Sequence, residues 1–160
     1  MHPDYLCHQE QPLPVRLKPE TVALLKRIQR QFDKNPSGFH MSWWKRQEGV
    51  GYTNPGQASF NPCGTTCCIG GWAAELSGKS ILYLLPGNLH SPEYVYNSQS
   101  YYAEILGIDV DKGWRLFHQE QWPQGFRENY DEAEKSGNHE AMASVAIQRI
   151  QHFIDTHGEE

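Results

Sequence analysis

The segment from residue 66 to residue 77 constrains the fold most, because the helix that it predicts has almost no solvent-facing side. A helix that is apolar on one side and small on the other belongs in the interior of a domain. A glycine inside a helix costs up to about 1 kcal/mol relative to alanine, so we expect another backbone to pass close by. The apolar side carries Ile69, Trp72, Ala73 and Leu76, and the small side carries Cys67, Gly70, Gly71 and Ala74.

Both ends of this helix carry residues typical of helix termini. Thr65 is predicted to cap its start, because a hydroxyl accepts a hydrogen bond from a free first-turn amide. Gly78 is predicted to end it, because glycine adopts the left-handed conformation readily. Three of the four cysteines, at positions 63, 67 and 68, fall at this start. The helix start is therefore either a reactive or ligand-binding end, or the packing centre of the fold.

The other periodic segments are also helical, and they predict a mainly α fold. A first helix begins at Pro19, and a later one ends at Gly107. Asp109 caps a short helix, another follows residue 123, and the last runs from its cap Asn138 to Gly158. We expect an irregular arm over residues 1–17 and one compact domain over 18–158, with helix 66–77 at its centre between the first and last helices. A small hairpin or short strands are expected near 39–60 and 80–96.

Composition excludes several classes of function. The formal net charge of -5 argues against a nucleic-acid partner. A local group of bases is interpreted as a solvated helix face. No apolar run is long enough to span a bilayer, and the first residues lack the pattern of a signal peptide, so we expect a cytoplasmic protein with reduced cysteines. The basic residues interpreted as a solvated helix face are Lys26, Arg27, Arg30, Lys34, Lys45 and Arg46.

A cysteine nucleophile is one interpretation of the helix start. A thiol in the first turn of a helix has a lowered pKa, and free amides there can form an oxyanion hole. Cys68 or Cys63 is the candidate nucleophile, and the base would come from elsewhere in the chain. Free cysteine more often behaves as a small buried hydrophobe, and that interpretation stays open beside the catalytic one. The candidate bases are His40, His90 and His118.

An anion or nucleotide site is the second interpretation. A helix N-terminus offers N–H donors and a positive dipole end to a phosphate, although the segment lacks the lysine of a P-loop. A metal site and a cofactor are not indicated, because the cysteines lack the C-x-x-C spacing of strong zinc motifs and the eight histidines form no ligand pattern. The candidate ligand-binding residues are Thr65, Thr66 and Cys67 with Trp43, Trp44 and Tyr52 from the preceding segment.

The block from residue 63 to residue 72 resembles a motif, C-G-T-x-x-C-I-x-G-W, of small uncharacterised proteins of bacteria and their phages. Later segments resemble the same proteins. The resemblance implies a helix-rich fold and no particular activity, and Cys67 is outside the motif. The matching residues are Cys63, Gly64, Thr65, Cys68, Ile69, Gly71 and Trp72, and the later segments are Leu106-Gly107-Ile108, Leu116-Phe117 and Trp122-Pro123.

The sequence therefore favours a non-catalytic cytosolic binding or interaction protein, with an association to phages or mobile elements as part of the hypothesis. Its expected partner is a small anionic or nucleotide-like ligand, or another protein, held near Thr65. The alternative is a cysteine-dependent enzyme that uses Cys68 or Cys63 with a histidine base. The sequence does not indicate the oligomeric state.

Overall fold

The computed structural model describes residues 16–41, 46–47, 65–66, 68–78 and 100–160, and these residues form a mainly helical fold, as predicted. A helical stretch without a label covers residues 100–106. The labelled elements, with η for short 3-10 helices, are α1 (Pro19–Lys34), η1 (Pro36–Gly38), β1 (Arg46–Gln47), β2 (Thr65–Thr66), α2 (Ile69–Leu76), α4 (Val110–Phe117), η3 (Gln119–Gln121), α5 (Gln124–Lys135) and α6 (His139–Asp155).

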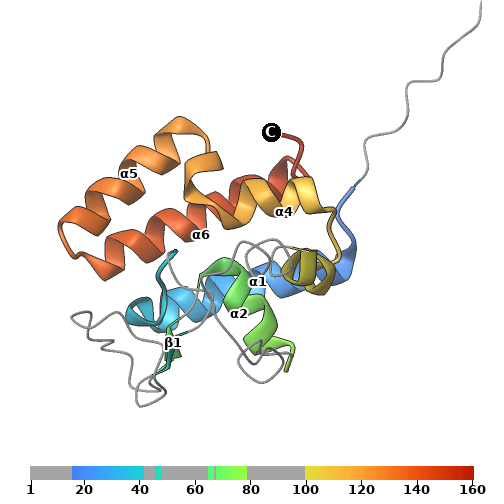
Figure 1. The fold of residues 1–160 in the computed structure, drawn as a ribbon, viewed down its shortest axis with the longest axis horizontal. Coiled ribbons are helices and arrows are strands. Elements are labelled where there is room, and N and C mark those ends of the chain that lie inside the picture. The colour runs from blue at the N-terminus through green and yellow to red at the C-terminus, as the bar shows by residue number, and fades with distance from the viewer. Residues whose placement is uncertain (1–15, 42–45, 48–64, 67, 79–99) are drawn as a thin grey trace, which may run out of the picture.

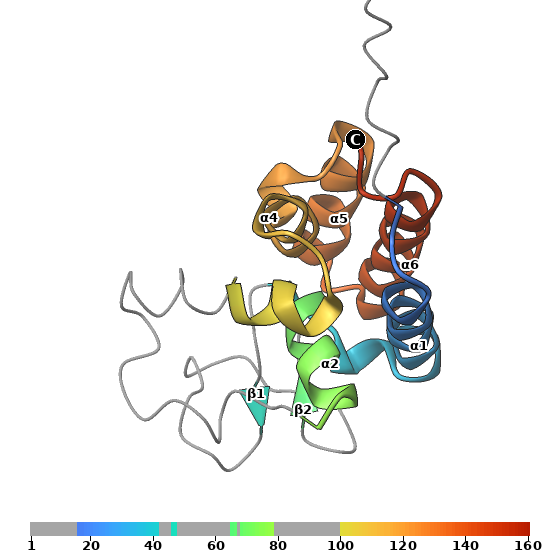
Figure 2. The same cartoon turned by 90° about the vertical axis from the view of Figure 1, so that its right-hand side faces the viewer.

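The helix α6 lies between α5 and α1 and packs against both (Figure 1). The helix α2 packs against α1 and α4. The strands β1 and β2 pair antiparallel, with Arg46 opposite Thr66 and Gln47 opposite Thr65. Figure 2 shows this short pair beside α2, on the side of the molecule away from α5 and α6. Most of the 39–60 segment and all of the 80–96 segment, where short strands are expected, lie outside the described residues.

The predicted helix caps of the second half are confirmed. Asp109 Oδ1 accepts a hydrogen bond of 2.8 Å from the Lys112 amide at the start of α4. Asn138 Oδ1 accepts one of 3.0 Å from the Ala141 amide at the start of α6. Gly107 has a φ of 69°, which lets the amide of residue 108 reach back to the carbonyl of residue 103. The sequence predicts these helix ends because each involves residues only a few positions apart.

The start predicted for the buried helix is wrong. Thr65 belongs to β2, and α2 begins at Ile69 with Cys68 as its N-cap. The Cys68 sulfur accepts a hydrogen bond of 3.4 Å from the Gly71 amide, which is the role predicted for the Thr65 hydroxyl. Residues 69 to 74 are all buried, so the lack of a solvent face is confirmed. The central position of this helix between the first and last helices stays a prediction.

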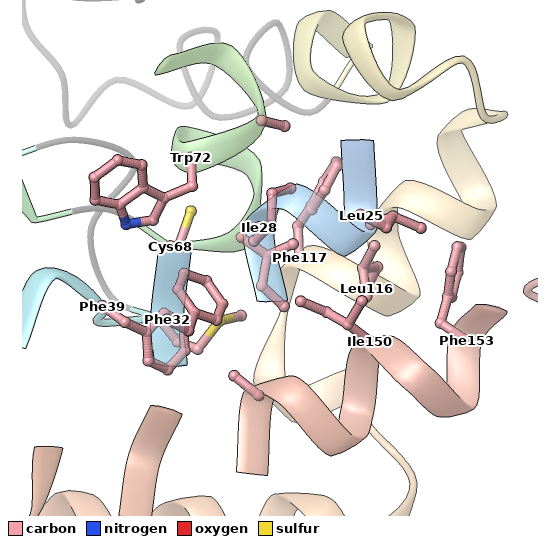
Figure 3. Packing of buried hydrophobic residues seen from close by; sticks show 14 of the residues in the cluster. Leu25, Ile28, Phe32, Phe39, Cys68, Trp72, Leu116, Phe117, Ile150 and Phe153 are labelled. Atoms are coloured by element: carbon pink, nitrogen blue, oxygen red, sulfur yellow. The ribbon is translucent and has the colours of Figure 1, made fainter. Parts of the chain in front are cut away.

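One apolar cluster joins the described helices. Figure 3 shows Phe32 and Phe39 on the same side of this cluster as Cys68 and Trp72. The rings of Phe32 and Phe39 lie 4.4 Å apart in a tilted arrangement. Since Phe39 follows η1, this contact returns the chain from the end of α1 to the core. The cluster also includes Leu25, Ile28, Leu116, Phe117, Met142, Ile150 and Phe153.

Two polar side chains fix the segment after α1 to the rest of the fold. Trp72 Nε1 donates a hydrogen bond of 2.7 Å to the Gly38 carbonyl. The Tyr130 hydroxyl accepts one of 3.0 Å from the Met41 amide. Both bonds are buried, and each satisfies a backbone group that belongs to no regular ladder. They therefore join α2 and α5 through the segment between residues 38 and 41.

Replacing Trp72 with phenylalanine should lower the free energy of unfolding by about 1–3 kcal/mol, because the buried Gly38 carbonyl loses its donor. Urea unfolding measures the change. Trp114→Phe is the matched control, because Trp114 is 41% exposed and such a substitution shifts stability by no more than about 0.5 kcal/mol. Equal losses in the two variants would contradict a structural role for the indole bond.

Candidate functional site

Cys68 is the best-described member of the sequence-predicted site, and its surroundings are those of a core residue. The side chain is 2% exposed and lies in the cluster with Trp72 and Phe32 (Figure 3). Burial raises the pKa of the thiol to about 12, and the hydrogen bonds from Gly71 and Gly70 only partly offset this rise. A thiol with this pKa is almost wholly protonated at neutral pH, whereas the thiolate is the reactive form. The lowered pKa expected for a nucleophile at this position is therefore wrong for Cys68.

The start of α2 is also poorly suited to bind an anion. A helix N-terminus binds anions through amides that lack a partner. Here the Gly71 amide donates to the Cys68 sulfur, and Thr65 and Thr66 belong to a strand before the helix. The ligand-binding assignment of the surrounding residues stays a prediction. Its other members Trp43, Trp44, Tyr52 and Cys67, and the catalytic candidates Cys63 and His90, lie outside the described residues.

His40 contacts α5. Its Nε2 lies 3.9 Å from Glu134 Oε1, and its side chain is 13% exposed. Burial raises the pKa of the Glu134 carboxyl, and the neighbouring Asp131 carboxylate raises it further. Tyr130 on the same helix accepts a hydrogen bond from the amide of Met41, the residue after His40. This bond attaches the chain next to His40 to α5. The described contacts of His40 thus place it in the packing between η1 and α5.

His118 lies at the end of α4 and stacks on Trp114. The two ring centroids are 4.3 Å apart, with an interplanar angle of 30°. Burial lowers the pKa of the imidazole, and the nearby Glu120 carboxylate opposes this only in part. The neutral imidazole is therefore the form that the folded chain favours. The described contact of His118 is one of ring stacking.

The face of α4 that carries this stack is exposed. Val110 is 43% exposed and Trp114 is 41% exposed. Because the two residues are four positions apart on one helix, their side chains lie next to each other. His118 continues the same line by a further four positions. We call Val110, Trp114 and His118 the α4 stripe. The structure thus places Trp114 at the surface.

A group of three bases that the sequence interpretation missed lies between α4 and α6. Arg149 is fully buried, Lys112 is 6% exposed, and Arg115 is half-buried. We call these three residues the cationic cluster. Arg149 lies over the rings of Phe126 and Phe153, with its Cζ 6.0 and 5.8 Å from their centroids. Burial lowers the pKa of Arg149, and the positive charge of Arg115 lowers it further.

Residues 158–160 supply the negative charge that this cluster needs. Glu160 holds the Arg149 guanidinium with both carboxylate oxygens, at 2.6 Å for the Nη2–Oε2 pair. Glu159 Oε1 lies 3.1 Å from Lys112 Nζ, and Arg115 donates a hydrogen bond of 2.8 Å to the Gly158 carbonyl. A buried cation that loses its partner costs about 3–5 kcal/mol, so the Arg149–Glu160 pair holds residues 158–160 against α6.

A weak signal for this cluster was present in the sequence. Arg149 follows Met142 by seven positions and Ala146 by three, so it stands on the apolar face of the last helix. A charge on such a face requires a buried partner. No spacing rule indicates which carboxylate that partner is, because Glu160 reaches Arg149 only after the chain turns back beyond α6.

Within the part of the chain that the structure describes, no group of three or more histidine, cysteine, aspartate or glutamate side chains is arranged to hold a metal ion. None of the helices in the same residues is both long enough and apolar enough to cross a membrane. An open groove between α5 and α6 is lined by short polar side chains such as Asn129, Ser136 and Gln148, all of them exposed.

No protein-family model, curated protein or solved structure matches this chain significantly. The resemblance to the C-G-T-x-x-C-I-x-G-W proteins therefore stays a prediction. Function must be inferred from the residues and contacts described above.

The lowered pKa of His118 predicts a pH dependence of stability. In the window between that lowered pKa and the ordinary value of about 6.5, the unfolded chain binds more protons than the folded chain. The free energy of unfolding should therefore rise with pH across this window, and His118→Gln should remove that part of the rise. Urea unfolding at several pH values measures it, with His139→Gln as a control for the loss of one histidine. An unchanged slope in His118→Gln would contradict the assignment.

Proposed function

We propose that this protein is a binding protein without catalytic activity, and that its partner is another protein. The observation that supports the first part is the state of Cys68. Its thiol caps a helix, is 2% exposed, and has a pKa raised to about 12. A nucleophile needs the opposite environment, which is partly exposed and electropositive. Cys68 then serves to pack and cap α2 rather than to react.

The α4 stripe supports the choice of a protein as the partner. Tryptophan is enriched at protein–protein interfaces and carries much of their binding energy. Trp114 is 41% exposed, although the chain buries Trp72 and Trp122 almost completely. Val110 enlarges the apolar surface beside it, and the stacked His118 restricts the orientation of the indole. A rigid aromatic side chain of this kind loses little conformational freedom when it is covered.

The cysteine-dependent enzyme remains the competing hypothesis through Cys63 alone, which lies outside the described residues. Cys68 no longer supports it, and His40 and His118 have described contacts with Glu134 and Trp114. One experiment on the thiols separates the two hypotheses.

Iodoacetamide labelling of the native protein, with each cysteine followed by peptide mapping across pH, should show Cys68 as unreactive until the chain unfolds. The buried thiol and its raised pKa are the physical reason. Labelling in urea is the control, because all four cysteines should then react. A native cysteine that reacts with an apparent pKa well below about 8.5 would favour the enzyme hypothesis instead.

Trp114→Ala should weaken partner binding strongly while leaving the fold intact. A truncated interface tryptophan costs about 2 kcal/mol or more of binding energy, which is at least about a thirtyfold loss of affinity. The wild type and the variant are compared as baits in an extract of the organism that encodes the chain, and each captured protein is then purified and titrated. Gln119→Ala, next to the stripe, is the matched control. A partner that binds Trp114→Ala as tightly as the wild type would contradict this role of the stripe.

A further inference from the structure

The cationic cluster is unusual for a core because the described carboxylates that contact it belong to a single short segment. Lys112 and Arg115 belong to α4, and Arg149 belongs to α6. In the described residues, all the carboxylates bound to the cluster come from residues 158–160, which follow the last helix. The three basic side chains therefore line one site, which residues 158–160 occupy.

The contacts at this site recognise the features of an acidic peptide. Arg115 donates to a main-chain carbonyl, that of Gly158, at 2.8 Å. Lys112 binds the carboxylate of the next residue, and Arg149 binds the carboxylate of the one after it with both oxygens. The three basic side chains thus bind one peptide carbonyl and the two carboxylates that follow it in the chain. A free phosphate carries its oxygens on a single phosphorus atom, whereas these three contacts reach groups on three successive residues.

The close fit around Gly158 adds a steric criterion. Its φ is 73°, and a Cβ on this residue would come within 3.0 Å of Lys112 Cδ and of the Phe153 ring. The cluster therefore accepts a glycine followed by two acidic residues. The preceding His157 also has a positive φ, of 53°, and its Nδ1 accepts the Leu17 amide at 3.3 Å.

Donors remain at the site after residues 158–160 have bound. Arg149 Nε and Arg115 Nε are both buried, and neither has a hydrogen-bond partner within the described part of the chain. Buried donors are normally satisfied, so a better-fitting occupant can still gain contacts here. Glu159 is 54% exposed, which leaves one edge of the occupied site open to solvent.

We infer that the cationic cluster is a binding site for an acidic peptide segment of a partner protein, and that residues 158–160 occupy this site in competition with it. The inference rests on the proposed function and names the chemistry of the partner. About 100° of rotation per residue places Arg115 on α4 between the exposed stripe and the buried Lys112. A partner that covers Trp114 can therefore also extend an acidic segment to Arg115.

The test is a binding measurement with a peptide of the chain's own sequence. The probe is fluorescein-labelled Thr-His-Gly-Glu-Glu, which repeats residues 156–160, and the control probe is Thr-His-Gly-Gln-Gln. The proteins are the full wild-type chain and the full chain with Glu159→Gln and Glu160→Gln, measured by fluorescence anisotropy in about 50 mM salt, where ionic contacts are weakly screened.

The double variant should bind the acidic probe at least about tenfold more tightly than the wild type, because an attached competitor acts at an effective concentration of about 1 mM. The Gln-Gln probe should not bind. Adding Arg115→Gln to the double variant should remove the gain, since Arg115 holds the peptide carbonyl. Equal weak binding of the acidic probe to the wild type and the double variant would overturn the inference, as would equal binding of the two probes.

A second variant covers the case in which the double variant is unfolded by circular dichroism. Glu159→Gln alone leaves the Arg149–Glu160 pair in place and changes a carboxylate that is 54% exposed. It should bind the acidic probe about threefold more tightly than the wild type, and no gain in this folded variant would overturn the inference. Displacement of the probe by inorganic phosphate at about 10 mM would also overturn it, in favour of a small-anion site.

A failure of the acidic-peptide inference can be distinguished from a failure of the proposed function. A reactive native cysteine would reject the non-catalytic function but would not change the peptide titration. Loss of partner binding in Trp114→Ala, together with no probe binding to the Gln variants, would keep the proposed function and reject only the acidic chemistry of the partner.

Discussion

The buried guanidinium of Arg149 is the interaction on which the arrangement of the second half depends. A charge without solvent contact needs both a partner and hydrogen bonds, so it fixes every group that satisfies it. Arg149 on α6 binds Glu160 and donates 3.2 Å to the Arg115 carbonyl on α4, while Phe126 of α5 lies 6.0 Å from its Cζ. Three helices and the returning segment thus meet at one side chain.

The first half of the chain is joined to these helices by side-chain hydrogen bonds to backbone groups that lack a partner within a helix or strand. The indole of Trp72 binds the Gly38 carbonyl, and the hydroxyl of Tyr130 binds the Met41 amide. Burial raises the pKa of Tyr130 well above its ordinary value, so its hydroxyl stays protonated and neutral. Within the described residues, Cys68 and Trp72 of the motif are buried in the core, and the exposed large apolar side chains, Val110 and Trp114, belong to α4.

The sites considered for function differ in what they require of the fold. A nucleophilic cysteine needs exposure and a stabilised thiolate, and Cys68 has neither. An interface needs a rigid apolar anchor and charges of defined position, and α4 offers Trp114 with the neighbouring Arg115. Because α4 carries both, the exposed stripe and the cationic cluster can act on one partner.

The sequence alone predicted the mainly helical fold, the caps Asp109 and Asn138, and the buried character of residues 69 to 74, because each depends on residues a few positions apart. It misplaced the helix start at Thr65, since the choice of Cys68 as the cap depends on the pairing of β2 with β1. The pairing of Arg149 with Glu160 and the exposure of Trp114 are visible only in the folded chain. The turn after α6 brings Glu160 back to Arg149, and the packing of α4 against the rest of the fold sets the exposure of Trp114, so neither follows from the spacing of residues along one helix.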